Sequence, residues 1–144
     1  MNPSNVILVE LGLRVAALAQ LAVAILNLFL IRIMNWKPDL DRAPLLIHEV
    51  FRVHVVFMSL TLSIFAVLTW RFAAEIAAGP NPLAIWLATA IGLFWLVRSI
   101  MQWLHYSSSH WRGNVGRTWI HWMLFLGYGA IAIVYFLAAF RRKT

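Results

Sequence analysis

The chain has no cysteine, and only 12% of its residues are charged. The absence of thiols excludes disulfides, iron–sulfur clusters, thiolate metal sites and cysteine nucleophiles. A soluble domain contains about 25% charged and about 45–50% apolar residues, whereas 62% of this chain is hydrophobic. Because so few charges cannot cover a surface in water, the composition indicates an integral membrane protein.

Helix breakers are also scarce, and they divide the apolar sequence into four segments. The chain has five prolines, and four of them lie in the polar stretch 34–44 and in the AAGPNP run at 77–82, where they oppose continued helix. We expect membrane-spanning helices at about 6–33, 45–72, 83–106 and 117–140, since about 20 apolar residues cross a bilayer core. The expected fold is an all-α, antiparallel four-helix transmembrane bundle with short loops. It forms one membrane domain over 1–144.

The net charge of +7 does not indicate binding to nucleic acid. Lysine and arginine occur mainly in the loops and at the helix ends, where they can contact anionic lipid head groups. The lipid bilayer is therefore the expected partner, while other membrane subunits and a second copy of the chain are left open. Once the more deeply placed Arg52 and Arg98 are set aside, the basic residues divide equally between the two membrane faces, so the positive-inside rule does not predict the orientation.

All five histidines fall towards one face of the expected topology, the face opposite both termini. Several tryptophans lie at the same level, but tryptophan prefers the membrane interface in any case. The histidines are therefore the more informative set: His48, His54, His105, His110 and His121.

Helical periodicity groups these histidines with other polar residues. At 100° per residue, Arg98, Gln102 and His105 share one stripe of the third segment. His48 shares a stripe of the second segment with Arg52, and His54 lies about 120° away from it. Polar residues inside a membrane normally face the bundle interior, so the stripes predict a shared cavity. The candidate cofactor-binding residues are His48, His54, His105, His121, Arg52, Arg98 and Gln102.

Arg98 is the most informative of these candidates because its own segment contains no acidic residue. An unpaired buried guanidinium costs several kcal/mol, so Arg98 is expected to have a counter-group. That group is Glu49 across the bundle, a set of carbonyls at a helix end, or a bound ligand. Haem propionates, quinone carbonyls, a lipid phosphate and a partner's carboxylate would each complement the arginines.

Three kinds of function remain open on the sequence. A bis-histidine haem b needs two histidines on facing helices with arginines near the propionates, and a quinone site uses similar residues without iron. A metal site has suitable ligands in His48, His105, His110, His121 and Glu49. A purely structural role needs only packing faces and interfacial anchors.

In size and histidine placement the chain resembles small four-helix proteins associated with respiratory oxidases and b-type cytochromes. The resemblance extends to no motif and assigns no residue. The sequence favours a small membrane subunit or ligand-binding protein of a redox system, with haem b or a quinone as its cofactor. The alternatives are a structural or assembly subunit of a larger membrane complex and a histidine-ligated metal-binding membrane protein. Whether the protein is an enzyme is left open, and no catalytic residue is proposed.

Overall fold

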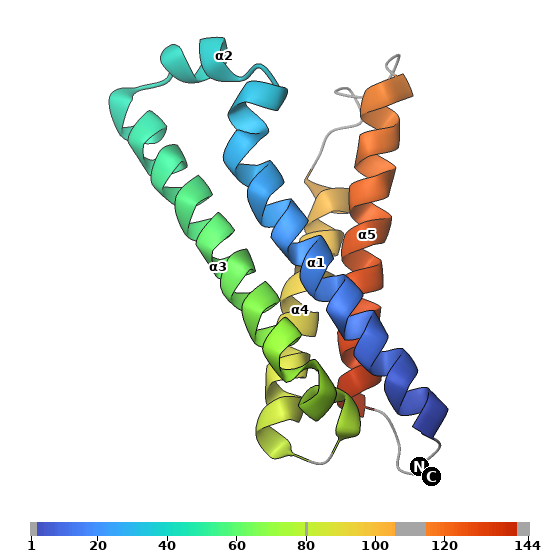
Figure 1. Ribbon diagram of the computed structural model, residues 1–144. Helices are drawn as coiled ribbons and strands as arrows, with labels where there is room; N and C mark the ends of the chain where they lie inside the picture. Colours follow the sequence, from blue (N-terminus) through green and yellow to red (C-terminus); the bar gives the residue numbers. More distant parts are fainter. Residues whose placement is uncertain (1–2, 80, 106–114, 141–144) are drawn as a thin grey trace. The chain divides into compact units, whose positions relative to one another are not determined.

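The structure is a computed structural model that describes residues 3–79, 81–105 and 115–140 (Figure 1). Its helices, in chain order, are α1 (Pro3–Ile33), α2 (Lys37–Asp41), α3 (Leu45–Ala78), α4 (Pro82–Leu104) and α5 (Val115–Phe140). The helices α1, α3, α4 and α5 are long and apolar enough to cross a membrane. The expected fold class is confirmed: the protein is an all-α, multi-pass integral membrane protein built as a helical bundle.

The break expected at 77–82 separates α3 from α4. Helix α3 ends at Ala78, and Gly79 follows with a φ of +100°, a backbone conformation that glycine adopts without steric cost. The Asn81 side chain then accepts a 2.9 Å hydrogen bond from the Leu83 backbone N–H and caps α4. Pro82 opens α4, where its missing N–H needs no helical partner.

Two elements differ from the sequence-based boundaries. The polar stretch 34–44 contains the short helix α2, whose first turn includes Pro38, a position that tolerates proline. Helix α3 continues beyond residue 72 to Ala78, with a non-helical residue at Phe72 (φ −109°, ψ 17°). The stretch 73–78 reads AAEIAA, which is rich in strong helix formers, and this explains why the helix resumes after Phe72.

The chain divides into two compact units, each described by itself. The α1–α3 unit is Arg14–Phe72, and the α4–α5 unit combines Met1–Leu13 with Ala73–Thr144.

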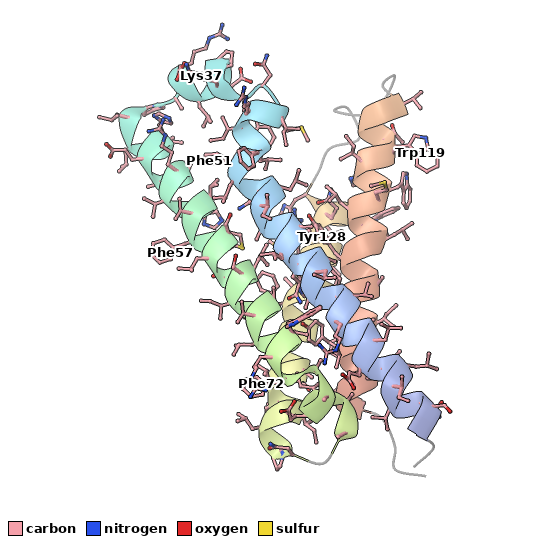
Figure 2. The ribbon with its side chains drawn as sticks, viewed as in Figure 1. Lys37, Phe51, Phe57, Phe72, Trp119 and Tyr128 are labelled. Atoms are coloured by element: carbon pink, nitrogen blue, oxygen red, sulfur yellow. The ribbon has the colours of Figure 1, made fainter. Side chains whose placement is uncertain are left out.

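In the α1–α3 unit, the two long helices form an antiparallel hairpin through α2 (Figure 1). Near the connection, the rings of Trp36 and Phe51 lie 6.4 Å apart. Towards the other end, the guanidinium of Arg14 lies 5.2 Å from the Trp70 ring centroid. Early residues of α1 thus meet late residues of α3, which defines the antiparallel direction. Figure 2 shows Phe57 on the side of α3 that faces away from α1, and this side chain is exposed.

A polar contact joins the middle of this hairpin. The Asn27 amide Nδ2 donates to the Val55 carbonyl at 3.1 Å and to the Ser59 hydroxyl at 3.0 Å. Ser59 in turn donates to Val55 within α3 at 2.9 Å. A hydroxyl both donates and accepts, so Ser59 is satisfied on both sides. Asn27 therefore connects α1 to α3 by side-chain hydrogen bonds between two otherwise apolar helices.

In the α4–α5 unit, α4 buries one stripe of mostly small side chains. The buried residues of α4 are Ala84, Ala88, Ile91, Gly92, Trp95, Ser99 and Gln102. Small residues let two helix backbones approach closely in a membrane. The Ser99 hydroxyl accordingly reaches the Phe125 carbonyl of α5 at 3.1 Å. The start of α1 belongs to this unit too, and a side chain at Gly12 would meet Val134 of α5 at 3.4 Å.

Gly92 gives a test of the close approach of α4 and α5. A Cβ at this position would lie 3.1 Å from both the Tyr135 Cβ and the Phe136 ring. Gly92→Leu is expected to lower the free energy of unfolding by about 1–3 kcal/mol through overpacking. The measurement is an unfolding titration in detergent micelles followed by circular dichroism. Gly127→Ala is the matched control, because nothing lies within 4 Å of its Cβ position, and it should leave stability unchanged or raise it by about 0.5–1 kcal/mol. Equal effects of the two variants would contradict this packing.

Asn27 gives a test of the hairpin contact in the other unit. Asn27→Ala removes the hydrogen bonds to Val55 and Ser59, and interhelical hydrogen bonds in membranes contribute about 0.6 kcal/mol on average and about 1.7 at most. A double-mutant cycle with Ser59→Ala should show coupling of this size in the same unfolding titration. Thr61→Ala is the control, because the Thr61 hydroxyl bonds to Phe57 of its own helix. A cycle with no coupling would refute the Asn27–Ser59 contact.

Candidate functional site

Three polar side chains form a hydrogen-bonded row between α4 and α5. The Arg98 Nη1 donates to the Gln102 Oε1 at 3.0 Å, one helical turn further along α4. The Gln102 Nε2 lies 3.1 Å from the His121 Nδ1 of α5. Gln102 is 4% exposed and His121 is 8% exposed, so both side chains of this contact between α4 and α5 are buried. Residues i and i+4 share one helix face, which explains how α4 brings Arg98 and Gln102 together.

The direction of each hydrogen bond in this row follows from the chemistry of arginine. A guanidinium only donates, so the amide oxygen of Gln102 faces Arg98 and its amide nitrogen faces His121. An amide nitrogen also only donates, and therefore the His121 Nδ1 accepts. A neutral imidazole with an accepting Nδ1 carries its proton on Nε2.

One aromatic ring lies beside the guanidinium, and a second ring packs against the first. The Arg98 Cζ lies 4.8 Å from the ring centroid of Tyr128, which is labelled in Figure 2. The Trp95 ring lies 5.1 Å from the Tyr128 ring, and both residues are buried. A cation over an aromatic face contributes about 0.5–2 kcal/mol, the larger value when it is desolvated. We call Arg98, Gln102, His121 and Tyr128 the Arg98 cluster.

Arg98 meets only neutral groups within the part of the chain that the structure describes. Its contacts there are the Gln102 oxygen and the face of Tyr128, and no carboxylate pairs with it. A guanidinium has five N–H donors, and one of these makes the hydrogen bond to Gln102. Arg98 is half-buried. The charge therefore retains donor capacity for an oxygen acceptor.

The other candidates from the sequence lie elsewhere. His105 directly follows α4 and is exposed, although it was expected on the stripe of Arg98 and Gln102. In the α1–α3 unit, His48 is half-buried, and Glu49, Arg52 and His54 are exposed. Their proposed roles as cofactor or metal ligands stay predictions.

The predicted metal ligands were His48, Glu49, His105, His110 and His121. His110 lies outside the described residues. Among residues 3–79, 81–105 and 115–140, no group of three or more histidine, aspartate or glutamate residues could hold a metal ion. Within the α4–α5 unit, His121 instead takes part in the hydrogen-bonded row with Gln102.

Tyr128 and Trp95 are the residues of this site that the sequence did not assign. Tyr128 lies seven residues after His121, which is two helical turns, so the two residues share a face of α5, and this spacing was the available signal. Trp95 lies three residues before Arg98, but a buried tryptophan in a membrane helix is most simply explained by packing. Neither spacing predicts that an arginine of the neighbouring helix lies over the tyrosine ring.

A second aromatic group lies beside the cluster and is exposed. The Trp103 ring lies 5.7 Å from Trp122 and 5.6 Å from Phe125, and Trp122 lies 6.0 Å from His121. Trp103 and Trp122 are both exposed. Figure 2 shows Trp119 also projecting outward from α5. Exposed tryptophans near helix ends are typical of the aromatic belt at a membrane interface.

No protein family, curated protein or solved structure matches this chain. The argument about function therefore starts from the geometry of the Arg98 cluster.

Gln102 gives a test of the hydrogen-bonded row. Gln102→Leu leaves the His121 Nδ1 and one N–H of Arg98 without their partner, so the free energy of unfolding should fall by about 1–3 kcal/mol. The measurement is again unfolding in detergent micelles. Thr89→Val is the control on the same helix, because the Thr89 hydroxyl bonds to Ile85 of α4 and its loss should change stability little. A Gln102→Leu protein as stable as Thr89→Val would show that the row contributes nothing.

Proposed function

We propose that the protein is a small membrane subunit of a redox system that binds the polar head of a membrane-soluble cofactor at the Arg98 cluster. The observation that supports this proposal is the half-buried charge of Arg98 beside neutral partners. Arg98 lies six residues before Leu104, the end of α4, and so about 9 Å along the helix from it.

The energetic argument starts from the cost of this position. An arginine at the centre of a membrane helix costs about 2.5–3.5 kcal/mol on the insertion scale, and Arg98, which lies nearer the end of α4, costs less. The hydrogen bond to Gln102 and the ring of Tyr128 offset part of that cost without neutralising the charge. An anionic or carbonyl oxygen would do more, since hydrogen bonds from arginine to such oxygens are among the strongest in proteins.

Two redox cofactors carry such oxygens on an apolar body. A haem b would place a propionate at Arg98 and would need two histidine ligands, for which the described part of the α4–α5 unit offers His121 and His105. A quinone would place one carbonyl oxygen at Arg98 and its ring near the aromatic side chains of Trp95 and Tyr128. The competing proposal is a structural or assembly subunit, in which Arg98 extends towards the interface and binds no cofactor.

The experiment compares Arg98→Ala and Arg98→Lys with the wild-type protein in detergent micelles. The absorption spectrum of the purified protein reports haem, and isothermal titration with decylubiquinone reports a quinone site. Both variants should weaken cofactor binding by about tenfold or more, because lysine lacks the planar fork that holds an oxygen acceptor. Arg42→Ala is the matched control, since Arg42 is exposed and follows α2.

The outcomes separate the two proposals. If neither a Soret band nor decylubiquinone binding is found in the wild-type protein, the redox proposal is wrong. Unchanged binding in both Arg98 variants, with lower thermal stability, would leave Arg98 as a structural residue. Equal losses in the Arg98 and Arg42 variants would indicate a general charge effect and not a site.

A further inference from the structure

We infer that Arg32 of α1 and Arg52 of α3 together form a binding site for the phosphate of an anionic phospholipid, at the α2 end of the α1–α3 unit. The inference is independent of the Arg98 cluster, which belongs to the other unit. It depends on the register of α1 against α3 and on the partners of the charged residues in these two helices.

The contacts between α1 and α3 determine which of their residues lie at the same level. The guanidinium of Arg14 lies over the ring of Trp70, so these two positions face each other. Eighteen residues complete five turns of an α-helix, and residues eighteen positions apart therefore point in the same direction. Arg32 lies eighteen residues after Arg14, and Arg52 lies eighteen residues before Trp70. Because the helices run antiparallel, Arg32 and Arg52 lie level with each other and on the same side of the hairpin as the first pair.

Two further contacts enclose this level from both directions. Towards the middle of the hairpin, the Asn27 side chain hydrogen-bonds to the Val55 carbonyl. Towards α2, the Trp36 ring lies 6.4 Å from the Phe51 ring. Along each half of the hairpin, the arginine lies between the polar contact and the aromatic contact. The contacts on both sides therefore agree with the register that the five-turn repeat gives.

The length of helix between the two levels places the arginine pair at a membrane boundary. The segments from Arg14 to Arg32 and from Arg52 to Trp70 each correspond to about 27 Å of helix, and the hydrocarbon core of a bilayer is about 30 Å thick. Residues 15–31 of α1 contain no charged side chain. With one level at the head groups of one membrane face, the other level lies at those of the opposite face. Arg32 and Arg52 are thus within reach of lipid phosphates.

The two levels differ in how their charge is compensated. Arg14 has the face of Trp70 as a partner, whereas at the other level a second arginine occupies the position that corresponds to Trp70. Arg32 and Arg52 are both exposed, and within the described part of the chain no side chain forms an ion pair, hydrogen bond or ring contact with either. Glu49, one turn before Arg52, is exposed and does not pair with it. Because like charges repel, an anion bound to both guanidinium groups would stabilise this end of the unit.

A phosphate diester is the anion that this level of the bilayer supplies. A guanidinium binds phosphate through two parallel N–H donors, so Arg32 and Arg52 can hold one phosphate from two sides. One turn nearer the membrane centre on the same helix faces, Phe29 and Val56 are exposed and offer apolar surface to an acyl chain. A free phosphate would leave that surface unused. The phosphate of phosphatidylcholine is compensated by its own choline group, which favours an anionic phospholipid such as phosphatidylglycerol.

The first experiment measures lipid binding by native mass spectrometry of the full-length protein released from detergent micelles. The wild-type protein should bind phosphatidylglycerol about tenfold more tightly than phosphatidylcholine. Arg32→Gln and Arg52→Gln should each weaken the binding of phosphatidylglycerol by about tenfold, the effect of losing a hydrogen bond between charged groups. Arg42→Gln is the matched control, because it removes the same charge from an exposed arginine that follows α2 at the same end of the unit.

The second experiment measures the melting temperature in detergent micelles by circular dichroism, with and without phosphatidylglycerol. Without the lipid, Arg52→Gln should melt at the wild-type temperature or above it, because one of two like charges has been removed. With the lipid, the wild-type protein should gain stability and Arg52→Gln should not, since a ligand stabilises only the state that binds it. Arg14→Gln is the contrast: it loses the contact with Trp70 and should melt below the wild-type temperature in both conditions.

The remaining outcomes overturn the inference. Equal wild-type affinity for the two lipids does so whether or not any variant folds. An equal loss in Arg42→Gln indicates general charge attraction, and a loss in only one of Arg32→Gln and Arg52→Gln shows that the two arginines do not form one site. An Arg52→Gln protein that melts below the wild type without lipid indicates a structural role for the arginine. Inorganic phosphate that raises the melting temperature as much as phosphatidylglycerol does assigns the site to a soluble anion and not to a lipid.

Discussion

A guanidinium inside a hydrocarbon span has to keep its donors hydrogen-bonded, because lipid tails offer no acceptor. Arg98 meets part of this constraint through one hydrogen bond to the amide oxygen of Gln102 and through the face of Tyr128. The amide can serve Arg98 only in one orientation, and that orientation determines what it presents to His121. Arg98 on α4 thereby determines that the Gln102 amide nitrogen, a donor, faces the His121 Nδ1 on α5. The chemistry of the α4–α5 unit depends on this one requirement.

The packing of the helices makes this row possible. Gly92 and Ser99 are small, buried and in contact with α5, and this close approach lets the Gln102 side chain reach His121. The Ser99 hydroxyl donates a hydrogen bond to the Phe125 backbone carbonyl of α5, so the two helices pack closely at this position. In the α1–α3 unit, Asn27 has a similar role with the backbone of α3. In both units, small or polar residues form the contacts between the helices, whereas the exposed side chains are mostly apolar, as expected for a surface in contact with lipid.

The sequence predicted the fold well because its signals are local. Long apolar runs and the break at 77–82 are sufficient to predict four spans. They did not predict that α3 resumes after Phe72 and continues to Ala78. Periodicity also placed Arg98 and Gln102 on one face of a helix. It could not predict that Gln102 would be the partner of the guanidinium, since that depends on the side-chain rotamers and on how α5 packs against α4. The same limit applies to Tyr128, whose ring face lies beside Arg98 only because of interhelical distance. His105 was expected on the same stripe and keeps a helical backbone conformation as the C-cap of α4, but its side chain is exposed, which periodicity does not predict at a helix end.

The division of the Arg98 cluster between two helices has a consequence for how the chain enters the bilayer. Arg98 and Gln102 belong to α4, whereas His121 and Tyr128 belong to α5. A lone α4 leaving the translocon would expose an arginine and a glutamine to lipid, at a cost of about 2.5–3.5 kcal/mol for the arginine alone at the helix centre. Arg98 and Gln102 can hydrogen-bond to each other within α4, but the Tyr128 ring and the His121 nitrogen become available only once α5 has been synthesised. Helix α4 is therefore expected to wait at the lateral gate and to partition into the membrane together with α5, as one helical hairpin.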